Sequence, residues 1–204
     1  MASLLLRGFA LGFAIAASPG PIFFLCIRRT LVQGRLYGLF SGFGVATADA
    51  FYAAIATFGV AALTTALVGG RRPLALVGGA VLIVLGLRIM LKRARAQPLP
   101  PTAARGLARA YATTFGLTIT NPATILSFAA LAATLGLGTG GSFTRPAAVV
   151  AGVLAGSAAW WCILALATSV LRARMTPRVV GAISTFSGFA IAALGLVAVY
   201  SALT

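Results

Sequence analysis

The sequence contains no histidine, no glutamate and a single aspartate, Asp49, alongside sixteen basic residues. Without histidine or a second carboxylate, the chain has no Ser-His-Asp triad, no general acid–base pair and no zinc motif. It also has no P-loop, so ATP is not expected to be its direct energy source. We therefore predict a protein that is not an enzyme and that holds no cofactor and no metal ion.

Charge is scarce overall, because only 8 % of the residues are charged whereas 60 % are hydrophobic and the mean hydropathy is +1.05. A soluble domain carries roughly 25 % charged residues. The net charge of +15 does not indicate nucleic-acid binding, because the basic residues stand in short clusters between long apolar runs, as membrane loops do. The composition predicts an all-α membrane protein, since backbone groups in hydrocarbon must be satisfied within each segment.

Six apolar runs are long enough to cross a bilayer core of about 30 Å, which needs about 20 residues in a helix. The second run is longer than one span requires, so part of it must tilt, project or break. The first run has no small-residue cleavage site, so we expect it to remain in the mature protein. The six runs are Leu4–Ile27, Leu36–Val68, Pro73–Leu91, Ala110–Leu135, Pro146–Leu171 and Pro177–Leu203.

The basic residues predict the orientation. Twelve of the sixteen fall on one side of the predicted membrane, and positive charge favours the cytoplasmic side. These twelve are Arg28, Arg29, Arg35, Arg88, Lys92, Arg93, Arg95, Arg105, Arg109, Arg172, Arg174 and Arg178. Both termini are then expected outside. The proline-rich segment QPLPPT lies inside and divides the chain into residues 1–96, a linker at 97–105, and residues 106–204.

The two halves resemble each other in order. Gly79 and the motif Leu85-Gly86-Leu87 recur as Gly188 and Leu194-Gly195-Leu196, each at an offset of 109 positions. The small residues before Asp49 recur in the fifth run at an offset of 110. Because each half has three spans, the second half must insert upside down. Such inverted repeats are typical of secondary transporters.

Corresponding helix breaks are predicted in the first and fourth runs. The first break lies at Ser18-Pro19-Gly20-Pro21 and the second at Thr120-Asn121-Pro122. Proline interrupts a helix but suits the first position of a new one. Ser18 and Asn121 are suitable N-cap residues for the restarted helices. Each restart offers free N–H groups to a carboxylate. We predict that these seven residues line the substrate site.

Asp49 is predicted to join this site, because a carboxylate at the centre of a spanning helix costs about 2.5–3.5 kcal/mol on insertion scales. Such residues are usually functional. Burial favours the protonated form and a nearby cation favours the ionised form, so Asp49 is a candidate for proton coupling. Two alternatives stay open: Asp49 pairs with Arg28, Arg29 or another arginine, or Arg28 and Arg29 attract an anionic group of the substrate.

Two motifs resemble those of the lysine exporter (LysE/RhtB) superfamily. Residues 8–53 hold a Pro-Gly-Pro element followed by a glycine-rich run with an aspartate, and LTITNPATILSF at residues 117–128 is similar to the family's Asn-Pro element. GLRIML and LGLVAVY fit the third and sixth spans. Ile22 departs from the asparagine that many relatives have after Pro-Gly-Pro. Ala123-Thr124 departs from the lysine that often follows Asn-Pro in threonine and homoserine exporters.

The resemblance implies a secondary transporter of the bacterial inner membrane that exports an amino acid or a related small metabolite, driven by the proton motive force. The single acid favours a neutral amino acid over lysine, and a homodimer is left open.

Three other functions stay open as alternatives. A thiol–disulfide electron conduit would use Cys26 and Cys162, and a metal-ion exporter would need ligands that the chain lacks. A non-transporting assembly protein also stays open. Trp160 and Trp161 are expected to serve packing more than substrate contact.

Overall fold

The computed structural model describes residues 1–58, 70–91, 104–121, 123–128, 144–172 and 174–203, together with the backbone but not the side chain of Arg71. Within these ranges the chain is helical and has no strand, which confirms the predicted all-α class. The predicted linker therefore lies almost entirely outside the described residues. The helices are α1 (Ala2–Ala17), α2 (Pro21–Gln33), α3 (Arg35–Thr57), α5 (Arg71–Leu91), α6 (Ala104–Ile119), α8 (Thr144–Arg172) and α9 (Pro177–Leu203).

Four of the described helices are long and apolar enough to cross a membrane, namely α3, α5 from Arg72 onward, α8 and α9. The pair formed by α1 and α2 meets the same test as one bent span, which raises the number to five. The six spans stay a prediction, because the fourth run (Ala110–Leu135) extends beyond the described residues. α6 covers only its first part, and residues 123–128 continue it as a short helical segment.

The first predicted break is confirmed, since α1 and α2 meet at an angle of 79°. However, the prediction that Ser18 caps the restarted helix is wrong. Ser18 is instead the C-cap of α1, whereas Gly20 is the N-cap of α2 and Pro21 is its first residue. The cause is Pro21, which disfavours helical backbone at Gly20 and is itself suited to the first helical position. The new helix thus begins two residues later than expected.

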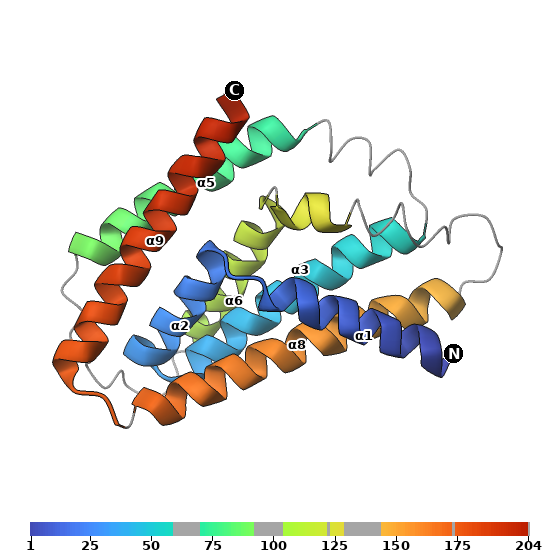
Figure 1. Ribbon diagram of the computed structural model, residues 1–204, viewed down its shortest axis with the longest axis horizontal. Helices are drawn as coiled ribbons and strands as arrows, with labels where there is room; N and C mark the ends of the chain where they lie inside the picture. Colours follow the sequence, from blue (N-terminus) through green and yellow to red (C-terminus); the bar gives the residue numbers. More distant parts are fainter. Residues whose placement is uncertain (59–69, 92–103, 122, 129–143, 173, 204) are drawn as a thin grey trace.

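The helices pack in two groups (Figure 1). α1 lies along α8, and α3 lies between α8 and α6. α5 and α9 lie along each other, and α2 reaches from the break to contact both α3 and α9. The segment between α2 and α3 is one residue, Gly34, whose φ of +99° favours glycine. This arrangement brings the end of α1, the start of α2 and the middle of α3 together.

Glycine allows the closest of these contacts. A Cβ atom on Gly12 would lie 2.3 Å from the backbone oxygen of Val153, and one on Gly156 would lie 2.0 Å from that of Phe9. α1 and α8 therefore touch backbone to backbone, as small residues permit in membrane helices. Gly152 and Gly156 of α8 both make such contacts with α1. At Gly181 of α9, by contrast, no atom lies within 4 Å of an added Cβ.

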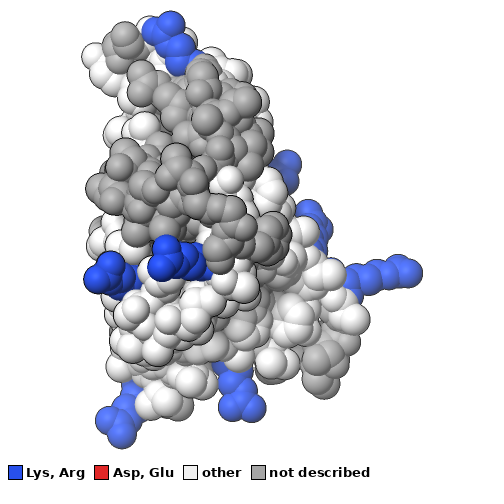
Figure 2. Space-filling model, turned by 90° about the vertical axis from the view of Figure 1, so that its right-hand side faces the viewer, with Lys and Arg blue, Asp and Glu red and all other residues white. Residues whose placement is uncertain are grey.

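The ends of the helices agree with the predicted grouping of basic residues. The turns between α2 and α3 and between α8 and α9, the end of α5 and the start of α6 all lie toward the left of Figure 1, and the N-terminus lies at the right. Figure 2 views the molecule from that right-hand side and shows basic side chains that stand apart from one another on this face. Which end faces the cytoplasm stays a prediction.

Candidate functional site

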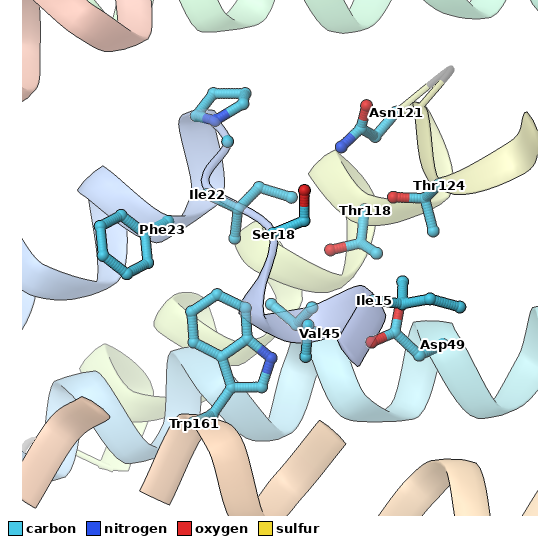
Figure 3. Close-up of a pocket in the computed structure, with 13 residues that line it drawn as sticks. Ile15, Ser18, Ile22, Phe23, Val45, Asp49, Thr118, Asn121, Thr124 and Trp161 are labelled. Atoms are coloured by element: carbon cyan, nitrogen blue, oxygen red, sulfur yellow. The ribbon is translucent and has the colours of Figure 1, made fainter. Parts of the chain in front are cut away.

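Five of the eight predicted site residues line one cavity of about 60 Å³ (Figure 3). Ser18, Gly20 and Pro21 come from the break between α1 and α2, Asp49 comes from the middle of α3, and Asn121 follows α6. The tertiary structure thus joins the two predicted breaks and the single acid at one place. A cavity of about 60 Å³ has room for several water molecules, so it can take a small polar molecule.

The other three predicted residues lie elsewhere. Pro19 does not line this cavity and is exposed. Thr120 lines a neighbouring, mainly apolar cavity of about 190 Å³ against α5 and α9, and its hydroxyl donates to the backbone oxygen of Gly116 (3.0 Å). Its side chain therefore turns back onto α6. Pro122 lies outside the described residues.

Asp49 is almost completely buried, with an exposed fraction of 2 %. The Ser157 hydroxyl, on α8, donates a hydrogen bond of 2.7 Å to Asp49 Oδ2, and it is itself fully buried. Across the described parts of the chain, Asp49 has no basic side chain at ion-pair distance. The alternative in which Asp49 pairs with an arginine is therefore wrong for these residues, and a neutral hydroxyl takes that position.

The guanidinium groups of Arg28 and Arg29 bind elsewhere. Arg29 Nη1 donates to Ser41 Oγ (2.8 Å) and to the backbone oxygen of Ala110 (2.9 Å), so it joins α2 to α3 and α6. Arg28 Nε donates to Ser184 Oγ (2.9 Å) and joins α2 to α9. Both side chains are half-buried. Through these hydrogen bonds both arginines link helices to one another. Their attraction for an anionic substrate group stays a prediction.

The second break is held by Asn121, as predicted. Its Oδ1 accepts a hydrogen bond from the backbone N–H of Ala123 (3.1 Å), and its backbone oxygen accepts from Ile125 (3.1 Å). This is the N-cap arrangement that satisfies the first free N–H groups of a helix. Because the oxygen is used in this way, the amide nitrogen is turned toward the side where Ser18 and Ile22 lie (Figure 3). The side chain thus offers donors to the cavity.

Tyr52 holds the two predicted parts of the site together. Its hydroxyl donates to the backbone oxygen of Ile119, at the end of α6, and its ring stacks on Phe128 beyond the second break. Tyr52 lies one helical turn after Asp49 on α3. The second break is therefore fixed against the same helix that carries the acid.

Sequence reasoning missed several residues of the cavity, of which Thr118, Thr124 and Trp161 have polar groups. The sequence gives a signal for Thr118 and Thr124 in their closeness to the Asn-Pro motif, since each lies three residues from Asn121. Trp161 is buried, with an exposed fraction of 4 %, and its ring packs on Gly42, where an added Cβ would lie 2.3 Å from Trp161 Cβ. It therefore serves packing, as predicted, and also lines the cavity.

Comparison with known proteins gives three findings. The family model for LysE type translocators matches residues 13–202. The chain is similar to the uncharacterized membrane protein YahN of Escherichia coli (strain K12), with 38 % identity over 66 residues. That match covers 32 % of this chain and 30 % of YahN, so the chain spans less than a third of the relative's length. No solved structure matches.

Proposed function

The chain belongs to the LysE type translocator family, and on this premise we propose that it exports an amino acid or a related small metabolite in exchange for protons. It is a multi-pass membrane protein and a translocator rather than an enzyme. The observation that carries the proposal is the burial of the one acid, Asp49, at a small cavity where two helix breaks meet. We place the protein in the bacterial inner membrane, with both termini outside.

The proposed architecture is two inverted repeats of three spans, and the contact between α5 and α9 supports it. A Cβ on Gly79 would lie 2.8 Å from the backbone oxygen of Gly195, and one on Gly86 would lie 2.5 Å from that of Gly188. In the sequence Gly79 corresponds to Gly188, and Gly86 to Gly195. Gly79 therefore lies against the counterpart of Gly86, and Gly86 lies against the counterpart of Gly79. A two-fold axis between the repeats requires this exchange.

In the proposed mechanism the substrate is a zwitterion that binds in the cavity of about 60 Å³ lined by Asp49, Ser18 and Asn121, which we call the Asp49 cavity. Its ammonium lies near the Asp49 carboxylate, and its carboxylate lies at the first turn of α2, where Ile22 and Phe23 line the cavity. No side chain caps α2, so its first N–H groups are available to an anion. A single acid suits one ammonium group, which favours a neutral amino acid over lysine.

Proton coupling is assigned to Asp49. A carboxyl group this deeply buried takes up a proton when its ammonium partner leaves, because an unpaired buried charge is unfavourable. Substrate and proton then compete for one group, and movement of one repeat against the other carries the proton inward and the substrate outward. Ser157 lies on α8 and Asp49 on α3, so their hydrogen bond crosses between the two proposed repeats.

The alternative functions gain no support from the site. A thiol–disulfide conduit needs an accessible thiolate. Cys26 is instead buried in an apolar cluster with residues such as Leu25 and Ile22, and neither cysteine forms a disulfide. A metal-ion exporter needs histidine, cysteine or carboxylate ligands for the ion, and this chain has no histidine and one acid.

The test is efflux from proteoliposomes under an imposed proton gradient, with labelled neutral, basic and acidic amino acids. The wild-type protein is expected to move a neutral amino acid only when the gradient is present. Asp49→Asn is nearly isosteric and can still accept a hydrogen bond from Ser157, but it cannot bind a proton. We expect it to lose gradient-driven efflux, by at least a hundredfold, while it retains its fold by circular dichroism. Gradient-driven efflux at the wild-type rate would refute the coupling role.

A further inference from the structure

Two buried indole N–H groups lie next to each other in the sequence, and neither has a hydrogen-bond partner among the described residues. They belong to Trp160 and Trp161 on α8. A buried polar group without a partner is rare in native proteins, and each case calls for an explanation. The two residues differ in one respect, because Trp161 lines the Asp49 cavity and Trp160 does not.

The Trp161 ring is held in place at the wall of the cavity. α3 approaches it through Gly42, which leaves no room for the ring to shift toward α3. Figure 3 shows the indole nitrogen on the side of the ring that faces Val45, in the direction of Asp49. Trp160 instead packs edge to face against Phe13 of α1, with ring centroids 5.4 Å apart. Only one of the two N–H groups is thus placed to meet a molecule in the cavity.

The cavity walls carry complementary chemistry. An ionised Asp49 only accepts hydrogen bonds, whereas an indole N–H only donates. The uncapped first turn of α2, at Ile22 and Phe23, lines the same cavity and also presents only donors. A molecule with a cation at one end and an anion at the other satisfies all three groups, while an amine satisfies Asp49 alone.

We propose that the Trp161 N–H donates a hydrogen bond to the carboxylate of the transported molecule, together with the first turn of α2. This inference rests on the proposed function. It makes Trp161 a specificity-determining residue, and it restricts the substrate class to molecules with a free carboxylate beside the ammonium group. Amines and amino-acid amides of the same shape are expected to be poor substrates of the wild-type protein.

The test compares amino acids with the amines that lack their carboxylate. The pairs are L-alanine with ethylamine and L-leucine with 3-methylbutylamine, each labelled and followed in proteoliposomes under a proton gradient. Trp161→Phe retains a smaller aromatic ring and removes the N–H. It is expected to raise the half-saturating concentration of the transported amino acid about tenfold, since a hydrogen bond to a charged group is lost. The half-saturating concentration of the amine is expected to stay unchanged.

Trp160→Phe is the matched control, because it removes the other unpartnered N–H from a position outside the cavity. It is expected to leave both half-saturating concentrations at their wild-type values. Equal weakening of the amino acid and the amine in Trp161→Phe would overturn the proposal and indicate a packing role. An unchanged half-saturating concentration for the amino acid would overturn it as well. If the wild-type protein moves no compound, the proposed function itself fails, and this inference fails with it.

Fluorescence gives a second measurement that does not depend on transport. The chain has two tryptophans, so Trp160→Phe leaves Trp161 as the only indole. In that variant the bound amino acid is expected to shift the emission of Trp161, whereas the amine causes no shift. In Trp161→Phe the same amino acid is expected to leave the emission of Trp160 unchanged. A shift caused equally by amine and amino acid would contradict a bond to the carboxylate.

Discussion

The two helix breaks have similar sequences and different local structures. Both place a polar residue directly before proline, at Ser18-Pro19 and at Asn121-Pro122. At the second break the Asn121 side chain caps the N–H of Ala123. At the first break the cap is Gly20, which has no side chain, and the first N–H groups of α2 stay free of any side-chain cap. The second break therefore satisfies its own backbone, whereas the first presents its backbone donors to the cavity.

The two breaks therefore have different roles in the proposed mechanism. In the proposed mechanism the first break binds the anionic end of the substrate, because only there are helix N–H groups available. The second break supplies a side-chain amide and is tied to α3 through Tyr52. A pair of related motifs in two repeats thus need not form a symmetric site.

The largest effect is expected from removing the first break. In Pro19→Ala/Pro21→Ala both positions regain a backbone N–H and can adopt helical backbone, so α1 and α2 can join as one continuous helix. The 79° bend would then be lost and the N–H groups of α2 would pair within the helix. We expect efflux to fall at least a hundredfold, measured in proteoliposomes.

Pro177→Ala is the control for this double variant, because Pro177 is the exposed first residue of α9 and lies away from the cavity. It is expected to transport at the wild-type rate. Wild-type efflux by the double variant would show that the break is not needed for transport and would remove the basis for comparing the two breaks.

A smaller effect is expected from giving the first break the cap of the second. Gly20 has extended backbone, and a Cβ placed there meets no atom within 4 Å, so Gly20→Asn fits the fold. The new side chain would accept from the first N–H groups of α2, as asparagine does at N-caps. We expect the half-saturating concentration of the amino acid to rise about fivefold to tenfold while the melting temperature stays the same or rises slightly.

Gly20→Ala separates capping from bulk, because alanine adds a Cβ without a hydrogen-bond acceptor. It is expected to leave the half-saturating concentration within about twofold of the wild-type value. If Gly20→Ala weakens transport as much as Gly20→Asn, the backbone donors at this break do not bind the substrate.

The smallest effect is expected on stability at the second break. Asn121→Ala removes the side-chain acceptor from the Ala123 N–H and should lower the free energy of unfolding by about 1 kcal/mol. Asn121→Ser restores an acceptor and should recover most of this loss. Ser18→Ala at the first break should change stability little, because Ser18 is exposed and is not the cap of α2. Thermal unfolding in detergent measures the stability of all three variants. A greater loss of stability in Ser18→Ala than in Asn121→Ala would contradict the comparison.

Much of the architecture could be predicted from the chain. The helical class, the break in the first run and the capping role of Asn121 follow from composition and local sequence, since apolar runs in lipid must be helical and proline ends a helix. The start of α2 could not be placed correctly, because two prolines compete and the second prevails by restricting Gly20.

The cavity was predicted in part. Ser18, Gly20, Pro21, Asp49 and Asn121 were chosen for their residue types and were found together. The partner of Asp49 was missed, because an arginine is the expected partner of a lone acid. The structure places Ser157 there, 108 positions away in the sequence, and the Arg28 and Arg29 side chains donate to other serine hydroxyls.

The sequence by itself determined that this chain is an all-helical membrane protein with a single acid and broken helices, because these properties depend on composition and on local backbone chemistry. Only the tertiary structure decided that Asp49 contacts Ser157, that Trp161 lines its cavity, and that the first break is left uncapped. Contacts between helices depend on which faces meet. In this molecule that is decided by close backbone approach at glycines, and one helical turn of shift would bring different residues to the same cavity.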